Sequence, residues 1–124
     1  MEPGQIFFYA VLLFFLFLNV RKFVRRRSVP QIDPSAIPAG SVLLDVRTEA
    51  ERSRDSIPGS VHIPLQELGS RSGELTKYRD ARIVCYCASG NRSLSAAVML
   101  KKLGYSSANL VGGISNWKLA AGRR

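Results

Sequence analysis

The sequence predicts a three-layer α/β domain, in which a parallel sheet lies between helices, preceded by one transmembrane helix. Two observations predict this class. Short runs of apolar and β-branched residues alternate with helical segments across residues 41–122, and strands separated by helices pair in parallel. Residues 5–24, in contrast, form a nearly continuous apolar stretch whose length as a helix approaches the thickness of a bilayer.

Residues 1–4 form a short tail, and the apolar stretch that follows is expected to cross a membrane. Every residue from Ile6 to Leu18 is apolar, and a helix over residues 5–24 would be about 30 Å long. A cleaved signal peptide carries its positive charges before the apolar run, whereas here they follow it. A surface-lying helix would be amphipathic, and this one is apolar on all sides. We expect a retained transmembrane helix, with a cleaved signal and a surface-lying or partner-bound helix as alternatives.

The basic residues between positions 21 and 27 predict the orientation of the chain. Lys and Arg next to a transmembrane helix stay in the cytoplasm, so the N-terminus is expected outside and the folded domain inside the cell. Cys85 and Cys87 form neither a disulfide framework nor a zinc ligand set, and free thiols agree with a reducing compartment. The expected location is the cell membrane, with a single pass through the lipid bilayer and a cytoplasmic domain.

The net charge of +9 does not indicate a nucleic-acid-binding protein. Of the 18 Lys and Arg residues, five lie within residues 1–27, and the others are scattered without interleaved aromatic residues. A moderately basic, solvated surface explains these charges. About 95 residues remain after the N-terminal stretch, which is enough for one domain with one core.

The residues after the apolar stretch predict a connection and then the first elements of the domain. Residues 25–40 are basic at first and contain three prolines, which leaves room for a short edge strand and a single helical turn. The apolar run at residues 41–46 predicts a strand buried on both faces. Residues 48–54 are polar, which favours one or two helical turns with Thr48 as the cap.

The rest of the chain, residues 41–122, continues the alternation of strands and helices. Gly104 ends the best-defined helix, whose apolar residues recur at helical spacing. Met99 in this helix and Trp117 are most simply core residues. The expected elements, in chain order, are a strand at 61–63, helical pieces at 65–78, a strand at 83–86, a helix at 93–103, a strand at 109–111 and a helix at 114–120.

Cys87 directly follows a predicted buried strand and begins a small polar loop that leads into a predicted helix. Ligands of parallel sheets bind beyond the carboxyl ends of the strands. Backbone N–H groups that form an anion nest, and the positive end of a helix dipole, favour a thiolate there. The sequence therefore predicts Cys87 as a nucleophile, with Gly90 permitting the sharp turn. The loop residues are Ala88, Ser89, Gly90, Asn91, Arg92 and Ser93.

Four patches resemble, in order, the rhodanese (thiosulfate sulfurtransferase) domain family in its small single-domain form. They are D-V-R-x-x-x-E at 45–51, I-P-G-S-V-H-I-P at 57–64, C-x-x-G-x-R-S at 87–93 and G-G-x-x-x-W at 112–117. The resemblance covers nearly all of residues 31–122 and implies a five-stranded parallel sheet. Two places depart from the pattern: Asp55 and Ser56 replace a Gly-His pair, and Arg52 stands where an aromatic residue is common.

The resemblance implies transfer of sulfane sulfur from a donor such as thiosulfate to a thiol or cyanide, through a persulfide on Cys87. It implies no metal and no organic cofactor. Asp45, Arg47 and Glu51 are expected to support the loop, although Asp45 and Arg47 could equally form a structural ion pair. Arg92 either points into the site or turns back toward Asp45 or Glu51.

The spacing between Cys87 and Arg92 separates sulfur transfer from the nearest alternative chemistry. Phosphatases and related arsenate reductases use C-x5-R, which is wide enough for a tetrahedral oxyanion. The C-x4-R of this chain is one residue tighter and suits a single sulfur.

Two further interpretations stay open: a non-enzymatic module of the same fold that docks a partner at the membrane, and a sulfur carrier loaded by a partner. Cys85 is expected to be a buried strand thiol rather than a resolving one, and His62 a structural residue.

Overall fold

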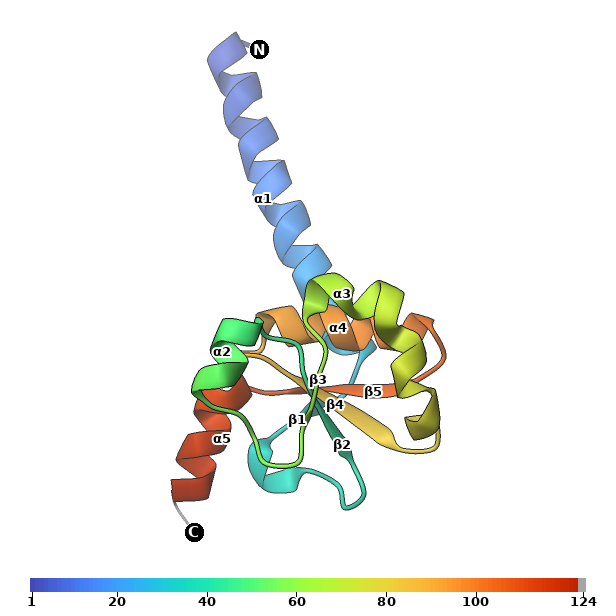
Figure 1. Ribbon diagram of the computed structural model, residues 1–124. Helices are drawn as coiled ribbons and strands as arrows, with labels where there is room; N and C mark the ends of the chain where they lie inside the picture. Colours follow the sequence, from blue (N-terminus) through green and yellow to red (C-terminus); the bar gives the residue numbers. More distant parts are fainter. Residues whose placement is uncertain (123–124) are drawn as a thin grey trace.

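Five parallel strands, in the order β1-β5-β4-β2-β3, form the sheet of the domain (Figure 1). The computed structural model describes residues 1–122. The predicted α/β fold with a five-stranded parallel sheet is confirmed. The elements are α1 (Pro3–Ser28), β1 (Gln31–Ile32), the 3-10 helix η1 (Pro34–Ala36), β2 (Val42–Asp45), α2 (Glu49–Arg54), β3 (Val61–His62), α3 (Leu65–Arg71), the 3-10 helix η2 (Ser72–Tyr78), β4 (Arg82–Tyr86), α4 (Asn91–Lys102), β5 (Ser106–Leu110) and α5 (Gly113–Gly122).

The side chains of β4 alternate between two cores, one on each face of the sheet. Ile83 and Cys85 pack with residues of α3 and α4, whereas Val84 and Tyr86 pack with residues of α5. Helices therefore cover both faces, as the apolar strand sequence predicts. Because β4 lies between β5 and β2, the residue that follows its carboxyl end, Cys87, emerges at the middle of the sheet edge.

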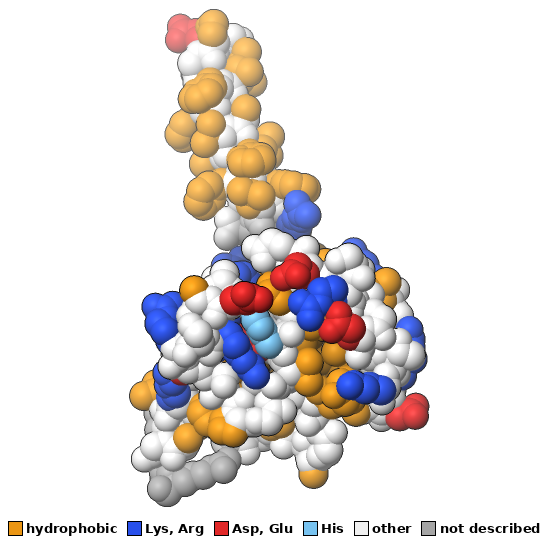
Figure 2. All heavy atoms as spheres, in the orientation of Figure 1, with side chains coloured by type: hydrophobic (Ala, Val, Ile, Leu, Met, Phe, Trp, Pro, Cys, Tyr) orange, Lys and Arg blue, Asp and Glu red, His pale blue; other side chains and the backbone are white. Residues whose placement is uncertain are grey.

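Helix α1 is longer than the apolar stretch that predicts it. None of its residues is buried, and within residues 1–122 it is the one helix long and apolar enough to cross a bilayer. Apolar side chains cover most of the length of α1, whereas basic and acidic side chains are spread over the surface of the domain (Figure 2). Residues 25–28, expected in the linker, are helical instead. The basic last turn complements the helix dipole, and Pro30 disfavours a helical conformation at Val29, where the helix ends.

Two other elements begin at least two residues before the expected position. Helix α4 begins at Asn91 instead of position 93, because Gly90 adopts a φ of 106° and ends the loop as the N-cap. Strand β5 begins at Ser106 instead of position 109, since its first residues are polar and give no apolar signal. Ser107 is nevertheless buried, and its hydroxyl donates to the carbonyl of Ala97 at 2.6 Å.

The short elements before and after β2 agree with the sequence. The expected edge strand and single turn are present as β1 and η1. Thr48 caps α2, because its hydroxyl accepts from the backbone N–H of Glu51 at 3.2 Å. This cap fixes the start of the helix that carries Glu51 toward the Cys87 loop.

Candidate active site

The thiol of Cys87 lies just beyond β4 and is almost completely buried, with 1% of the residue exposed. The backbone N–H of Gly90 donates to its Sγ at 3.0 Å. The Ser93 Oγ lies 3.4 Å from the same sulfur. The sulfur therefore sits at the N-terminus of α4, where the helix dipole favours negative charge.

Two opposing effects act on the pKa of Cys87. Burial alone would raise the pKa, because an apolar environment disfavours a thiolate. Hydrogen bonds from the Ser93 side chain and from the backbone of Ser93, Gly90 and Ser89 outweigh burial and hold the pKa below its ordinary value. All three donating residues belong to the loop residues 88–93 that the sequence predicts. The loop thus favours the thiolate, which is the nucleophilic form of cysteine.

Ser93 connects the sulfur to a residue that sequence reasoning missed. Its hydroxyl donates to Oδ1 of Asn109 on β5 at 2.6 Å, and Nδ2 of Asn109 donates to Oε1 of Gln31 at 2.9 Å. Nε2 of Gln31 donates to the carbonyl of Arg26, in the last turn of α1, at 3.1 Å. A chain of hydrogen bonds therefore joins the end of α1 to the thiol of Cys87. The sequence signal for Asn109 is weak: an amide within a short strand.

The N-terminus of α5 holds the carbonyl groups of the Cys87 loop. The backbone N–H of Ile114 donates to the Cys87 carbonyl at 2.9 Å, and the Ser115 hydroxyl donates to the Ala88 carbonyl at 3.1 Å. Gly113 has a φ of 61°, and a Cβ at this position would clash with the backbone oxygens of Cys87 and Ala88. Glycine is therefore required for α5 to approach the loop this closely.

The guanidinium of Arg92 is paired with Glu51. Nη1 and Nη2 of Arg92 donate to the two carboxylate oxygens of Glu51 at 2.6 and 2.8 Å. This bond lowers the pKa of Glu51 to about 2. Of the two directions open to Arg92 from the sequence, the structure shows the one toward an acid. The pair ties the first turn of α4 to α2.

Asp45 and Arg47 form a buried ion pair. Nη2 and Nε of Arg47 donate to Oδ2 and Oδ1 of Asp45 at 2.9 and 3.0 Å, and the two side chains are 3% and 0% exposed. Neither side chain hydrogen-bonds to residues 87–93 in the part of the chain that the structure describes. Of the two roles left open for this pair, the geometry corresponds to the structural one, whereas Glu51 contacts the loop directly.

Residues 33–120 match the Rhodanese-like domain family, well over half of the chain. The chain belongs to this family. Its sulfurtransferase relatives support sulfur transfer as the general chemistry of this rhodanese-like domain.

Three relatives show the range of proteins that this rhodanese-like chain resembles. A sulfurtransferase of Allochromatium vinosum is 40% identical over 77 residues, which cover 61% of this chain and 70% of the relative. The human thiosulfate:glutathione sulfurtransferase is 31% identical over 103 residues, which cover 73% of this chain and 90% of the relative. YrkF of Bacillus subtilis, whose name assigns it provisionally to the sulfur carriers, is 42% identical over 76 residues. That match covers 60% of this chain but 40% of YrkF.

Solved structures give the same fold. A rhodanese-related protein from Thermoplasma volcanium has a TM-score of 0.68 and 32% identity, over 73% of this chain and 92% of its own. The CoADR-RHD protein of Bacillus anthracis has a TM-score of 0.69 and 33% identity, over 77% of this chain. The rhodanese-like chain spans 18% of the length of that larger protein.

The two departures from the rhodanese pattern join the network around the buried ion pair. Arg52 donates to the hydroxyl and carbonyl oxygens of Ser60 at 2.7 and 2.8 Å. Asp55 accepts from Arg47 at 2.8 Å and pairs with Lys118 of α5. Lys118 and then Arg47 lower the pKa of Asp55 to about 2. These polar side chains tie α2 to the turn before β3 and to α5.

Cys85 and His62 lie near the rhodanese site, and the contacts of both side chains indicate structural roles. Cys85 is fully buried in β4, and burial raises its pKa, which fits the strand thiol expected from the sequence. Nε2 of His62 lies 2.8 Å from the Arg47 carbonyl and donates to it. Within residues 1–122, no group of three or more His, Cys, Asp or Glu side chains could hold a metal ion.

An open groove of about 300 Å³ lies beside the rhodanese loop. Arg26, at the end of α1, faces this groove together with Ser89 and Gly90 of the loop. A cation beside the loop suits a small anionic ligand. The groove is lined by Arg26, Gln31, Ser89, Gly90, Asn91, Asn109, Val111 and Gly112.

Proposed function

We propose that the protein is a sulfurtransferase that carries sulfane sulfur as a persulfide on Cys87 and is anchored in the membrane by α1. The observation that carries the proposal is the hydrogen-bonded thiol, whose pKa is lowered despite its burial. The donors from Gly90 and Ser93 that favour a thiolate would also stabilise the negative charge of a persulfide. The groove beside Arg26 would admit a small donor anion such as thiosulfate.

In the first step, the Cys87 thiolate attacks the outer sulfur of thiosulfate. A bond forms between Sγ and this sulfur, the sulfur–sulfur bond of thiosulfate breaks, and sulfite leaves with the electron pair. No general base is needed, because the hydrogen bonds already favour the thiolate.

In the second step, a thiolate or cyanide attacks the outer sulfur of the Cys87 persulfide. The bond between this sulfur and Sγ breaks, and Cys87 leaves as a thiolate. The products are a persulfide of the acceptor thiol, or thiocyanate. The hydrogen bonds from Gly90 and Ser93 stabilise the leaving thiolate in the same way as the attacking one.

The position of Arg92 favours sulfur transfer over phosphoryl transfer. A phosphatase of this general type needs positive charge and donors aimed at the oxygens of a tetrahedral oxyanion. Here both terminal nitrogens of the Arg92 guanidinium bind Glu51. Hydrolysis of an aryl phosphate by the wild-type chain, lost in Cys87→Ser, would contradict this choice.

A sulfur carrier loaded by a protein partner is the second candidate. The likeness to YrkF favours it, and so does the burial of Cys87, since a buried persulfide is shielded until an acceptor approaches. An enzyme would turn over thiosulfate many times, whereas a carrier would retain at most one transferable sulfur per chain. The number of thiosulfate molecules turned over per chain therefore separates the two candidates.

The test is turnover of thiosulfate and cyanide by the full chain in mild detergent, followed as thiocyanate. We expect steady turnover by the wild type, none by Cys87→Ser, and most of the wild-type rate in Cys85→Ala. The Cys85 control removes the neighbouring thiol without touching the loop. Equal rates for the wild type and Cys87→Ser would overturn the proposal.

We further propose that α1 crosses the cell membrane with the N-terminus outside and the domain in the cytoplasm. The exposed apolar surface of α1 supports a membrane crossing. The basic residues at the end of α1 support the orientation. Protease added to inverted vesicles should digest the domain, whereas right-side-out vesicles should protect it. Digestion in right-side-out vesicles would contradict the orientation.

A further inference from the structure

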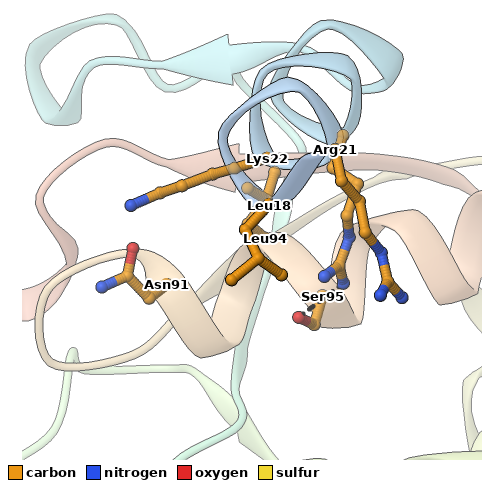
Figure 3. Close-up of a pocket in the computed structure, with 7 residues that line it drawn as sticks. Leu18, Arg21, Lys22, Asn91, Leu94 and Ser95 are labelled. Atoms are coloured by element: carbon orange, nitrogen blue, oxygen red, sulfur yellow. Dashed lines mark hydrogen bonds between the residues drawn. The ribbon is translucent and has the colours of Figure 1, made fainter. Parts of the chain in front are cut away.

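A basic cleft of about 330 Å³ lies between α1 and α4 (Figure 3). Both helices contribute side chains to it, and α4 lies on the side of the domain from which α1 projects (Figure 1). We use the term basic cleft for the residues that line it: Leu18, Arg21, Lys22, Arg25, Asn91, Leu94 and Ser95.

Within residues 1–122, the cations of the basic cleft have no acidic partner. Arg21, Lys22 and Arg25 take part in none of the ion pairs in the described part of the chain, and no Asp or Glu lines the cleft. Nη2 of Arg25 donates to the Ser95 hydroxyl at 2.7 Å. An adjoining groove shares Arg21 and Arg25 and adds Lys102 of α4. This uncompensated positive charge favours an anionic ligand.

Apolar side chains lie among these cations. In Figure 3, Leu18 of α1 and Leu94 of α4 lie together between the two helices. Lys22 extends on one side toward Asn91, and Arg21 extends on the opposite side of the two leucines. A ligand that fills the cleft would therefore meet an apolar surface and two flanking positive charges. This arrangement suits an amphiphile with an anionic headgroup better than a small hydrated anion.

The level of the basic cleft along α1 supports a lipid ligand. A helix rises about 1.5 Å per residue, so residues 5–24 correspond to the thickness of a hydrocarbon core. Arg21 and Lys22 lie near the end of this stretch, where Lys and Arg side chains extend to the headgroups. If α1 spans the bilayer, the cleft opens at the depth of the phospholipid headgroups.

We propose that the basic cleft binds the headgroup of an anionic phospholipid in the cytoplasmic leaflet. The proposal rests on the proposed membrane anchorage, and it is independent of sulfur transfer. A bound headgroup would bridge α1 and α4 through Arg21, Lys22 and Arg25. Because α4 begins directly after the Cys87 loop, the lipid would hold that loop and the groove beside Arg26 close to the membrane surface.

The test is native mass spectrometry of the full chain in a neutral detergent, titrated with phosphatidylglycerol or with phosphatidylcholine. We expect the wild type to retain phosphatidylglycerol preferentially. The double variant Arg21→Gln, Lys22→Gln should bind it about 25-fold more weakly, since each cation near an anionic surface contributes roughly fivefold. Arg21→Lys with Lys22→Arg keeps both charges and should retain the preference.

A charge-matched control, Arg54→Gln with Lys77→Gln, removes one Arg and one Lys outside the basic cleft and should bind as the wild type does. Equal retention of the two lipids by the wild type, or equal loss in the control, would overturn the proposal. So would displacement of the lipid by inorganic phosphate at equal concentration, which would indicate a site for free anions. Flotation of the chain with phosphatidylcholine vesicles tests anchorage separately: its absence overturns anchorage and lipid site together, whereas flotation without the lipid preference overturns the lipid site alone.

Discussion

At Cys87, the burial that shields the sulfur would make a thiolate unstable without the hydrogen bonds around it. The Gly90 N–H and the Ser93 hydroxyl reverse the effect of burial on the pKa. Ser93 has one hydroxyl proton, which is shared between two acceptors: the Cys87 sulfur at 3.4 Å and Oδ1 of Asn109 at 2.6 Å. The position of this proton therefore affects how strongly the loop favours the thiolate.

Replacing Ser93 by alanine should raise the pKa of Cys87. The variant removes a hydrogen bond that favours the charged form, and such bonds are worth about 1.5 kcal/mol or more, so alkylation near neutral pH should slow about tenfold. The measurement is the rate of iodoacetamide reaction against pH. Ser70→Ala, on an exposed turn of α3, is the control and should leave the profile unchanged. An unchanged profile in Ser93→Ala would show that Ser93 does not stabilise the thiolate.

At the scale of elements, three helices meet at the Cys87 loop. Helix α4 supplies its N-terminus, α5 binds the carbonyls of Cys87 and Ala88, and α2 holds Arg92 through Glu51. Each contact fixes a different part of the loop. The loop geometry is therefore a property of the packed helices more than of the loop sequence itself.

The pair of Arg92 and Glu51 should make part of the stability depend on acid pH. The pKa of Glu51 is lowered from 4.5 to about 2, so the pair stabilises the folded state fully above about pH 4.5 and loses this effect as the pH falls toward about 2. Glu51→Gln should cost about 1 kcal/mol at neutral pH, a small value because Arg92 is partly exposed. Urea denaturation at neutral pH and at acid pH measures both effects. A difference between wild type and variant that persists at low pH would contradict the pairing.

Replacing Gly113 by alanine should displace α5 from the loop. Alanine at positive φ costs about 1–2 kcal/mol, and the Cβ would also clash with the Cys87 and Ala88 oxygens. Denaturation followed by Trp117 fluorescence should show the loss. Gly69→Ala is the matched control, because its Cβ meets no atom within 4 Å and alanine favours a helix interior. Similar stability of the two variants would show that the close approach of α5 is unimportant.

At the scale of the whole molecule, the sequence predicts the elements with strong local signals. The apolar strands, the cap at Thr48, the turn at Gly90 and the long apolar helix agree with the structure. Polar strand β5 was predicted too short, because burial of Ser107 depends on a partner in α4. Helix α1 ends later than the sequence predicts. Its last turn is basic, so the apolar pattern that predicts the helix stops before the helix itself ends.

The parts of the site that the sequence does not show depend on contacts between distant residues. Arg92 binds Glu51 across 41 positions, and Asn109 binds Ser93 across 16. No local pattern determines which acid an arginine reaches, or which strand places an amide beside a loop. The basic cleft likewise forms where α1 packs against α4, so the charges at 21–27 indicate the membrane side but not the cavity.

The measurement that tests the central claim most directly is the intact mass of the full chain after incubation with thiosulfate at about pH 7.5. The account predicts the addition of one sulfur atom, located on Cys87 by fragmentation, lost in Cys87→Ser and kept in Cys85→Ala. An unmodified wild-type chain, or a sulfur atom located on Cys85, would contradict it.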